Sequence, residues 1–208
     1  MKSPAFNLTE YRDAEIAKNH SEYNVHDHLK HLSISDLQEV SRQDRLPWHS
    51  CFINVVGDLN IGTMIRTSHC LGAKSVTVFG RRRFDRRGLV GSANYITVDQ
   101  IEGMQDDVSV NRNAFYQMVH ERHWIPVFVE TGGQPLQEIN WPNIQRLAPK
   151  SEICLVMGNE TGGIPPDILQ NPFGTIVSIP QRGVIRSMNV STAHAIVAGA
   201  MCAALNWL

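Results

Sequence analysis

Short apolar runs alternate with longer amphipathic segments along most of this chain. Runs of about four to eight apolar residues are typical of buried strands, and a spacing of three to four residues is typical of helices. The pattern predicts strands over residues 51–56, 74–79, 95–98, 124–129, 153–157 and 175–179, and helices over about 62–71, 111–122 and 190–208. Strand, loop, helix and strand at this spacing form a βαβ unit, so the chain is predicted to be an α/β protein with a parallel sheet.

The first 48 residues differ from the rest because they are polar and rich in histidine and acidic side chains. They contain two predicted helices. One covers about residues 10–19, and the other is opened by Ser35, has Gln38 in the capping-box position and continues toward Arg42. Pro47 marks the end of this segment. We therefore expect an N-terminal extension over residues 1–48 and one domain over residues 49–208.

The composition is that of an ordinary globular protein, with 42% hydrophobic and 19% charged residues among 208. No apolar stretch approaches the roughly 20 residues that span a membrane, and the N-terminus lacks a signal pattern. We expect a cytoplasmic protein with no membrane partner. The cysteines Cys51, Cys70, Cys154 and Cys202 stand singly, which favours buried reduced thiols over a zinc or redox site.

The N-terminal segment also gathers four histidines, His20, His26, His28 and His31. A metal site is one interpretation of this cluster. Zinc sites draw on cysteine or carboxylate ligands at defined spacing and on a rigid frame, and this polar segment promises neither. We expect a solvated or partner-binding surface and no metal.

A basic loop follows the predicted strand over residues 74–79. The net charge of −1 excludes a surface that is basic all over, so a nucleic-acid partner would need a local patch. Five arginines around one aromatic ring suit phosphate contacts with a base or ribose stacked on the ring, although a solvated loop is the alternative. We predict RNA contacts from Arg81, Arg82, Arg83, Phe84, Arg86 and Arg87.

Three loops with small and polar residues follow or precede predicted strands at the edge where a parallel sheet binds ligands. They contain Asn60, Glu160, and the pair Ser187 and Asn189. The first of them, over residues 57–62, lacks the three spaced glycines of a dinucleotide-binding turn and the Gly-Lys-Ser/Thr of a phosphate-binding loop, so neither NAD nor ATP is favoured. Taken singly, the loop with Glu160 is equally consistent with a glycine-rich turn before a helix, and the loop with Ser187 and Asn189 is more typical of a helix cap.

Together, in order and spacing, these segments resemble the three motifs of the SpoU (TrmH-like) branch of the SPOUT RNA methyltransferases. The resemblance covers about residues 51–206, with Met188 standing where the family usually has leucine. It is carried by Asn60, Gly62 and Arg66, then by residues 158–164, then by Ile179 and Pro180 with residues 187–191 and Ala193.

The resemblance implies a parallel-sheet domain with a C-terminal deep trefoil knot, a homodimer packed through the knot helices, and an S-adenosylmethionine pocket. The pocket would be formed by the loops at residues 130–133, 158–163 and 179–189. The implied cofactor-binding residues are Glu130, Thr131, Gly132, Gly158, Asn159, Gly162, Ile179, Met188 and Asn189.

The implied activity is methylation of a ribose 2′-hydroxyl in tRNA or rRNA, which needs a positioned nucleophile and no metal. The implied catalytic residues are Arg66, Asn60, Glu160, Ser187 and Asn189. A guanidinium with a pKa above about 12 is a poor base, so Arg66 is either the base or an orienting phosphate clamp. Two alternatives remain open: an RNA-binding module without catalysis on the same fold, and a metal-dependent enzyme that uses the N-terminal histidines.

Overall fold

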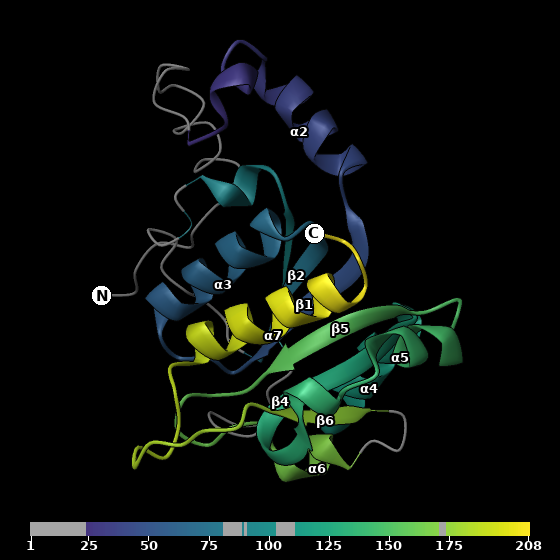
Figure 1. The fold of residues 1–208 in the computed structure, drawn as a ribbon. Coiled ribbons are helices and arrows are strands. Elements are labelled where there is room, and N and C mark those ends of the chain that lie inside the picture. The colour runs from purple at the N-terminus through teal and green to yellow at the C-terminus, as the bar shows by residue number, and fades with distance from the viewer. Residues whose placement is uncertain (1–23, 81–88, 90, 103–110, 171–173) are drawn as a thin grey trace.

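The computed structural model describes residues 24–80, 89, 91–102, 111–170 and 174–208. In this part of the chain, six parallel strands form one sheet with the order β3-β2-β1-β5-β4-β6 (Figure 1). The strands are β1 Leu46–Ile53, β2 Ala73–Phe79, β3 Thr97–Ile101, β4 Trp124–Pro135, β5 Glu152–Met157 and β6 Thr175–Ser178. The predicted α/β fold with a parallel sheet is confirmed.

Helices cover both faces of the sheet. The helix α3 and the last helix α7 pack side by side on one face, where Trp141 of α5 joins the same core, and α4 and α6 pack on the other face (Figure 1). The described helices are α2 Ile34–Gln43, α3 Asp58–Cys70, α4 Arg112–Glu121, α5 Trp141–Leu147, α6 Pro166–Leu169 and α7 Val190–Ala204, with short 3-10 turns η2 Asp27–Leu29, η4 Ser92–Asn94 and η5 Leu136–Glu138.

The central strand β1 begins at Leu46, well before the predicted start at residue 51, so that prediction was wrong. The first part of the strand was not predicted because it contains Pro47 and the polar residues His49 and Ser50. Pro47 is accommodated because the register with β2 is irregular between Leu46 and His49. The expected boundary between residues 48 and 49 therefore falls inside a strand.

Strand β4 also differs from expectation, because it continues through residues 130–133 to Pro135 where a loop was predicted. The pairing with β6 shifts between Val129 and Gln134, which both lie opposite Val177. Gly132 has a φ of 80°, which a glycine adopts without steric cost. The segment is thus an irregular stretch within a strand, of the kind that re-aims side chains at an edge.

The second predicted helix of the N-terminal segment is present as α2, but its N-cap is Ser33 and not Ser35. The Ser33 hydroxyl accepts a hydrogen bond from the backbone amide of Asp36, which satisfies a free amide of the first turn. The helix predicted over residues 10–19 lies outside the described residues.

Helix α2 is tied to the body of the domain at the end where β1 begins. Gln38 donates to the carbonyl oxygen of Asn94 at 3.1 Å, and Ser41 donates to that of Tyr95 at 2.9 Å. Arg45, just after the helix, donates to the carbonyl oxygen of Ala73 at 2.8 Å. These bonds fix α2 against η4 and the start of β2.

Three cysteines are buried as predicted, but Cys70 is exposed at the last residue of α3, so its predicted burial was wrong. Helix α7 ends at Ala204 and not at the C-terminus, because Asn206 takes a left-handed conformation. Among the described residues, no helix is long and apolar enough to cross a membrane.

Candidate functional site

The candidate site lies at the carboxyl ends of β1 and β5. From β1 the chain adds β2 and β3 on one side, and the later strands β4, β5 and β6 lie on the other side of β1. The direction in which strands are added therefore reverses between β1 and β5. Open α/β sheets bind ligands at such a reversal. A cavity of about 740 Å³ opens here, within the size range of small-molecule sites. Its walls come from the end of β4, the loop after β5, and the loop that leads into α7.

Glu160 joins the loop after β5 to the start of α3. Its carboxylate accepts hydrogen bonds from the backbone amides of Val56 at 2.9 Å and Gly57 at 2.8 Å, and from Nδ2 of Asn60 at 2.9 Å. Partial burial would raise the pKa of Glu160, but the bonds from Val56, Asn60 and Gly57 outweigh it and leave the pKa below its ordinary value. Glu160 is therefore an ionised clamp between two loops.

A side chain at position 57 would crowd the side chains of this clamp. A Cβ at Gly57 would lie 2.7 Å from Nδ2 of Asn60 and 2.8 Å from Oε1 of Glu160. The close approach of this backbone allows both adjacent amides to reach one carboxylate.

Asn60 is in turn hydrogen-bonded to the loop before α7. Nδ2 of Asn189 donates to Oδ1 of Asn60 at 2.9 Å. Oδ1 of Asn189 accepts from the backbone amides of Ser191 at 2.8 Å and Thr192 at 3.3 Å and so caps α7. One series of side-chain hydrogen bonds thus links Glu160, Asn60 and Asn189, three of the predicted catalytic residues.

The loop after β5 is held in shape by Asn159. Its Nδ2 donates to the carbonyl oxygen of Asn54 at 2.9 Å, and its Oδ1 accepts from the backbone amides of Thr161 at 2.8 Å and Gly162 at 3.1 Å. Because the polar atoms of this side chain bond to the loop itself and to the residue after β1, Asn159 contributes to the cavity mainly by fixing the backbone around it.

Glu130 connects the irregular part of β4 to the same loop. Its Oε2 accepts from the backbone amide of Ile164 at 3.0 Å, and its Oε1 accepts from that of Thr131 at 2.8 Å. Gly163 has a φ of 67°, and a Cβ there would collide with the Glu130 carboxylate. Glu130 thus needs a glycine opposite it to reach its partner.

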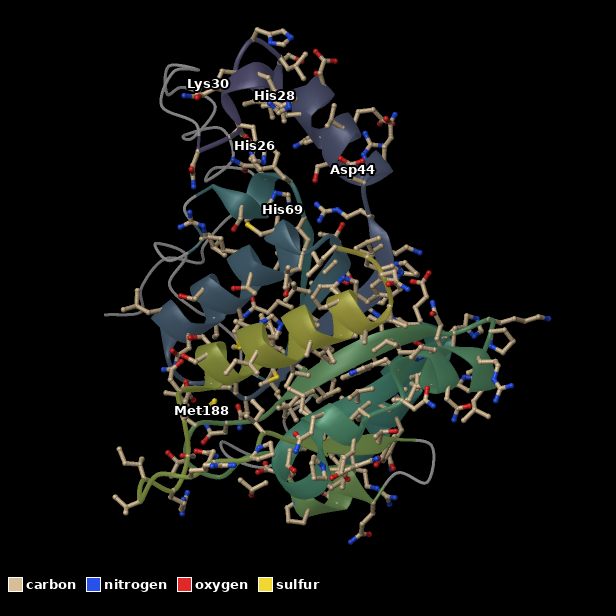
Figure 2. All side chains as sticks on the ribbon, in the orientation of Figure 1. His26, His28, Lys30, Asp44, His69 and Met188 are labelled. Carbon is tan, nitrogen blue, oxygen red and sulfur yellow. The ribbon has the colours of Figure 1, made fainter. Side chains whose placement is uncertain are left out.

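Most of the predicted site residues meet at the cavity. Those that line it are Glu130, Thr131, Gly158, Asn159, Glu160, Gly162, Ile179, Ser187, Met188 and Asn189. In Figure 2, Met188 lies beside the first turn of α7. Gly132 and Asn60 are not among the lining residues, although Asn60 is one hydrogen bond from two of them.

Arg66 is not brought to the cavity. It lies exposed on α3, and within the described residues it makes no hydrogen bond or ion pair. The predicted RNA-binding residues Arg81, Arg82, Arg83, Phe84, Arg86 and Arg87 lie outside the described residues.

Several residues of the cavity wall were not singled out as site residues in the sequence, although some lie in the predicted pocket loops. Gln181 and Arg186 come from the loop before α7, and Nη2 of Arg186 donates to the carbonyl oxygen of Thr161 at 3.2 Å. The wall also includes residues of the family motifs that were not assigned a role: Thr161, Gly163, Ile164, Val190 and Ala193. Val129 and Met157 are apolar, and nothing in the sequence separates them from the core. The searched part of the chain holds no group of three or more His, Cys, Asp or Glu side chains placed to bind a metal ion.

The SpoU rRNA Methylase family matches residues 51–199, which include every loop described above. The match covers well over half of the chain, and the chain belongs to this family. The fold and the three joined loops define a SpoU-type methylase domain, and the predicted family is thereby confirmed. Among curated proteins, none matches the chain.

Solved structures share the fold at low sequence identity. An AdoMet-bound rRNA methyltransferase from Sinorhizobium meliloti is 23% identical with a TM-score of 0.62, over 81% of this chain and 60% of that protein. The SpoU methyltransferase AviRb from Streptomyces viridochromogenes, in complex with AdoMet, is 20% identical with a TM-score of 0.58, over 76% and 57%. A TrmH/SpoU tRNA-modifying enzyme of A. aeolicus is 19% identical with a TM-score of 0.64, over 84% and 83%. The chain spans less than two thirds of the first two proteins.

Proposed function

We propose that this protein transfers a methyl group from S-adenosylmethionine to a ribose 2′-hydroxyl of RNA. The observation that carries the proposal is the set of hydrogen bonds from Glu160 through Asn60 to Asn189, which joins all three family motifs beside one cavity. Family membership and the cofactor bound to two similar proteins support the same activity.

The cavity suits the proposed cofactor. Its volume of about 740 Å³ fits a nucleoside with an amino-acid tail, and its walls combine aliphatic side chains with backbone from a glycine-rich loop. Met157, Ile179 and Met188 would pack against the adenine, while the polar groups of Glu130 and Thr131 would face the ribose. When bound, the cofactor supplies an electrophilic methyl group and the positive charge that the reaction discharges.

The chain's own residues would orient the RNA ribose and help to remove its proton. Ser187 lies exposed at the cavity and offers a hydroxyl next to Asn189. Arg66 is the proposed base or phosphate clamp, and its exposed guanidinium has no partner in the described residues that would compete for a phosphate. Glu160 and Asn60 act through the loops they hold and are positioning residues.

We also propose a homodimer with a C-terminal trefoil knot, acting on tRNA or rRNA in the cytoplasm. Family membership supports the knot. The outward faces of α3 and α7 support the dimer, because the two helices pack against each other and expose Leu59, Thr63 and Arg66 on one helix and Ala195 and Ile196 on the other. Pairing of two copies through this surface would bury the aliphatic side chains and bring Arg66 to the interface.

The test is to titrate the purified protein with S-adenosylmethionine by calorimetry and then to supply labelled cofactor with total cellular RNA. We expect the protein to bind the cofactor and to transfer labelled methyl groups to ribose 2′-oxygens. The variant Arg66→Ala should lose this transfer. Absence of both binding and transfer would refute the proposal. RNA binding that ignores the cofactor and Arg66→Ala would favour an RNA-binding module without catalysis. Mapping 2′-O-methyl sites in cells with and without the protein would identify the RNA.

A further inference from the structure

The loop between β6 and α7 has a feature that cofactor binding does not require. In Figure 1 it extends away from the body of the domain before it turns back into α7. Two adjacent β-branched side chains occupy its tip: Val184 is fully exposed and Ile185 is 76% exposed. Two neighbouring aliphatic side chains kept in water next to a binding cavity indicate a contact surface.

Arginines stand on both sides of this aliphatic pair. Arg182 and Arg186 are exposed, and in the part of the chain that the structure describes neither forms an ion pair with a carboxylate. Glu130 and Glu160 share the cavity wall with Arg186, but neither lies within ion-pair distance of it among the described residues. Arg186 lines the cavity and is held by the Thr161 carbonyl oxygen at 3.2 Å. The tip thus has an apolar centre and a cationic rim.

This combination matches the chemistry of an unstacked RNA strand. Aliphatic side chains inserted beside a base disrupt its stacking, and arginines on either side contact the flanking phosphates. A ribose that must enter a cavity beside Ser187 has to leave its neighbours, and side chains that occupy the vacated stack lower the cost of that step. We infer that Val184 and Ile185 form a wedge that unstacks the target nucleotide of a single-stranded RNA segment while Arg182 and Arg186 hold its phosphates.

A second copy of this chain is the alternative partner for the loop tip. A protein interface over this tip would bury the aliphatic pair, but it would also desolvate Arg182 and Arg186, which form no ion pair within the described part of the chain. RNA supplies the missing counter-charge. The inference rests on the proposed function and deepens it, since it assigns the substrate as a nucleotide in an unpaired loop.

The experiment compares the double variant Val184→Ser/Ile185→Ser with the control Leu147→Ser/Leu208→Ser. The control removes two side chains of similar exposure, 75% and 73%, from other parts of the surface. The probes are a hairpin RNA with 2-aminopurine in its single-stranded loop and a fully paired duplex of the same composition. The wild type and the control should raise 2-aminopurine fluorescence in the hairpin, and the wedge variant should lose that rise.

Methylation of total RNA should show a KM raised tenfold or more in the wedge variant, with the dissociation constant for S-adenosylmethionine within twofold of the wild type. Arg182→Ala/Arg186→Ala should reduce the slope of log affinity against log salt by about 1.4, at about 0.7 for each phosphate contact on a single strand. Unchanged fluorescence in the wedge variant overturns the inference. A shift of that variant from dimer to monomer in light scattering also overturns it, since the tip would then contact a second copy.

The two proposals fail separately. A wild-type protein that binds no cofactor and methylates no RNA refutes the proposed function, whereas loss of the fluorescence change only in the wedge variant still supports the wedge. If the wild type methylates RNA and the wedge variant has the same KM and the same fluorescence change, the proposed function stands and the wedge is refuted.

Discussion

Asn189 and Asn60 are bonded amide to amide at 2.9 Å although 129 residues separate them in the sequence. The direction of the bond matters. Asn189 uses its oxygen to cap α7, so it has only its nitrogen for Asn60, and Asn60 therefore turns its own nitrogen to Glu160. The amide of Asn60 is thereby oriented by both neighbours, and the starts of α3 and α7 are fixed to each other.

Replacing Asn60 by aspartate tests this directed series. Asn60→Asp keeps the acceptor for Asn189 but sets a second carboxylate against Glu160 in place of a donor at 2.9 Å. Loss of a hydrogen bond to a charged group and repulsion between like charges should lower the free energy of unfolding at pH 7 by about 2 kcal/mol. Urea unfolding at pH 7 measures this difference in the free energy of unfolding.

The same repulsion should raise the pKa of the Glu160 carboxyl, so the deficit of Asn60→Asp should shrink as the pH falls toward 4. Asn60→Ala, which introduces no charge, is the control and should show no such recovery. A variant as stable as the wild type at pH 7 would contradict the assigned direction of the bonds.

Adjacent glycines of the loop after β5 offer a matched pair of variants. Gly163→Ala puts a Cβ at a φ of 67° and into the Glu130 carboxylate, whereas a Cβ at Gly162 meets nothing within 4 Å. Gly163→Ala should lose about 1–3 kcal/mol of unfolding free energy from backbone strain alone and should weaken cofactor binding by displacing Glu130. Gly162→Ala should leave the free energy of unfolding unchanged. Melting curves check the stability of both variants, and cofactor titration checks Gly163→Ala; equal stability of the two would be inconsistent with the Glu130 contact.

The strands rich in apolar and β-branched residues were predictable because most of their side chains are buried on both faces. Residues 74–79 and 153–157 coincide closely with β2 and β5 for this reason. The start of β1 was not predictable, since His49 and Ser50 are acceptable in the sheet only through distant partners. His49 bonds to Ser75 and Glu152, and Ser50 bonds to His194.

The site was predictable as three separate loops but not as one network. Family motifs identify Glu160 and Asn189, yet the bonds from Glu160 to Val56 and from Asn189 to Asn60 depend on how β1, β5 and α7 are placed. The loop predicted at residues 130–133 was wrong because two glycines suggest a turn, whereas β6 supplies a neighbouring strand that extends β4 past them. The position of Arg66 outside the cavity wall also has no signature in the sequence.

Arg66→Ala should separate catalysis from folding. The side chain is exposed and has no partner in the described residues, so its removal should change the free energy of unfolding by no more than about 0.5 kcal/mol. Cofactor affinity should also hold, because Arg66 does not line the cavity. Turnover with RNA should fall by about 100-fold or more if the guanidinium acts on the substrate. Arg66→Lys distinguishes the two proposed roles, since a phosphate clamp should be partly restored by another cation. Normal turnover in Arg66→Ala would remove Arg66 from the mechanism.

The buried histidine of α7 should make the fold sensitive to mild acid. His194 is fully buried, its Nε2 lies 2.9 Å from Oγ of Ser50, and burial lowers its pKa to about 3. Since the folded state resists protonation until pH 3 while the unfolded chain takes up the proton near pH 6.5, the contribution of His194 is complete above pH 6.5 and is lost as the pH falls. Between pH 7 and pH 5 the loss should be about 2 kcal/mol.

Because His69 shifts in the same direction, to a pKa of about 4, the measurement must isolate His194 from it. The variant His194→Gln keeps a polar group for Ser50 and cannot titrate. It should be less stable than the wild type at pH 7, and urea unfolding at both pH values should show that difference shrinking by about 2 kcal/mol at pH 5. A difference that stays constant between pH 7 and pH 5 would mean that His194 is protonated in the folded protein or reached by water.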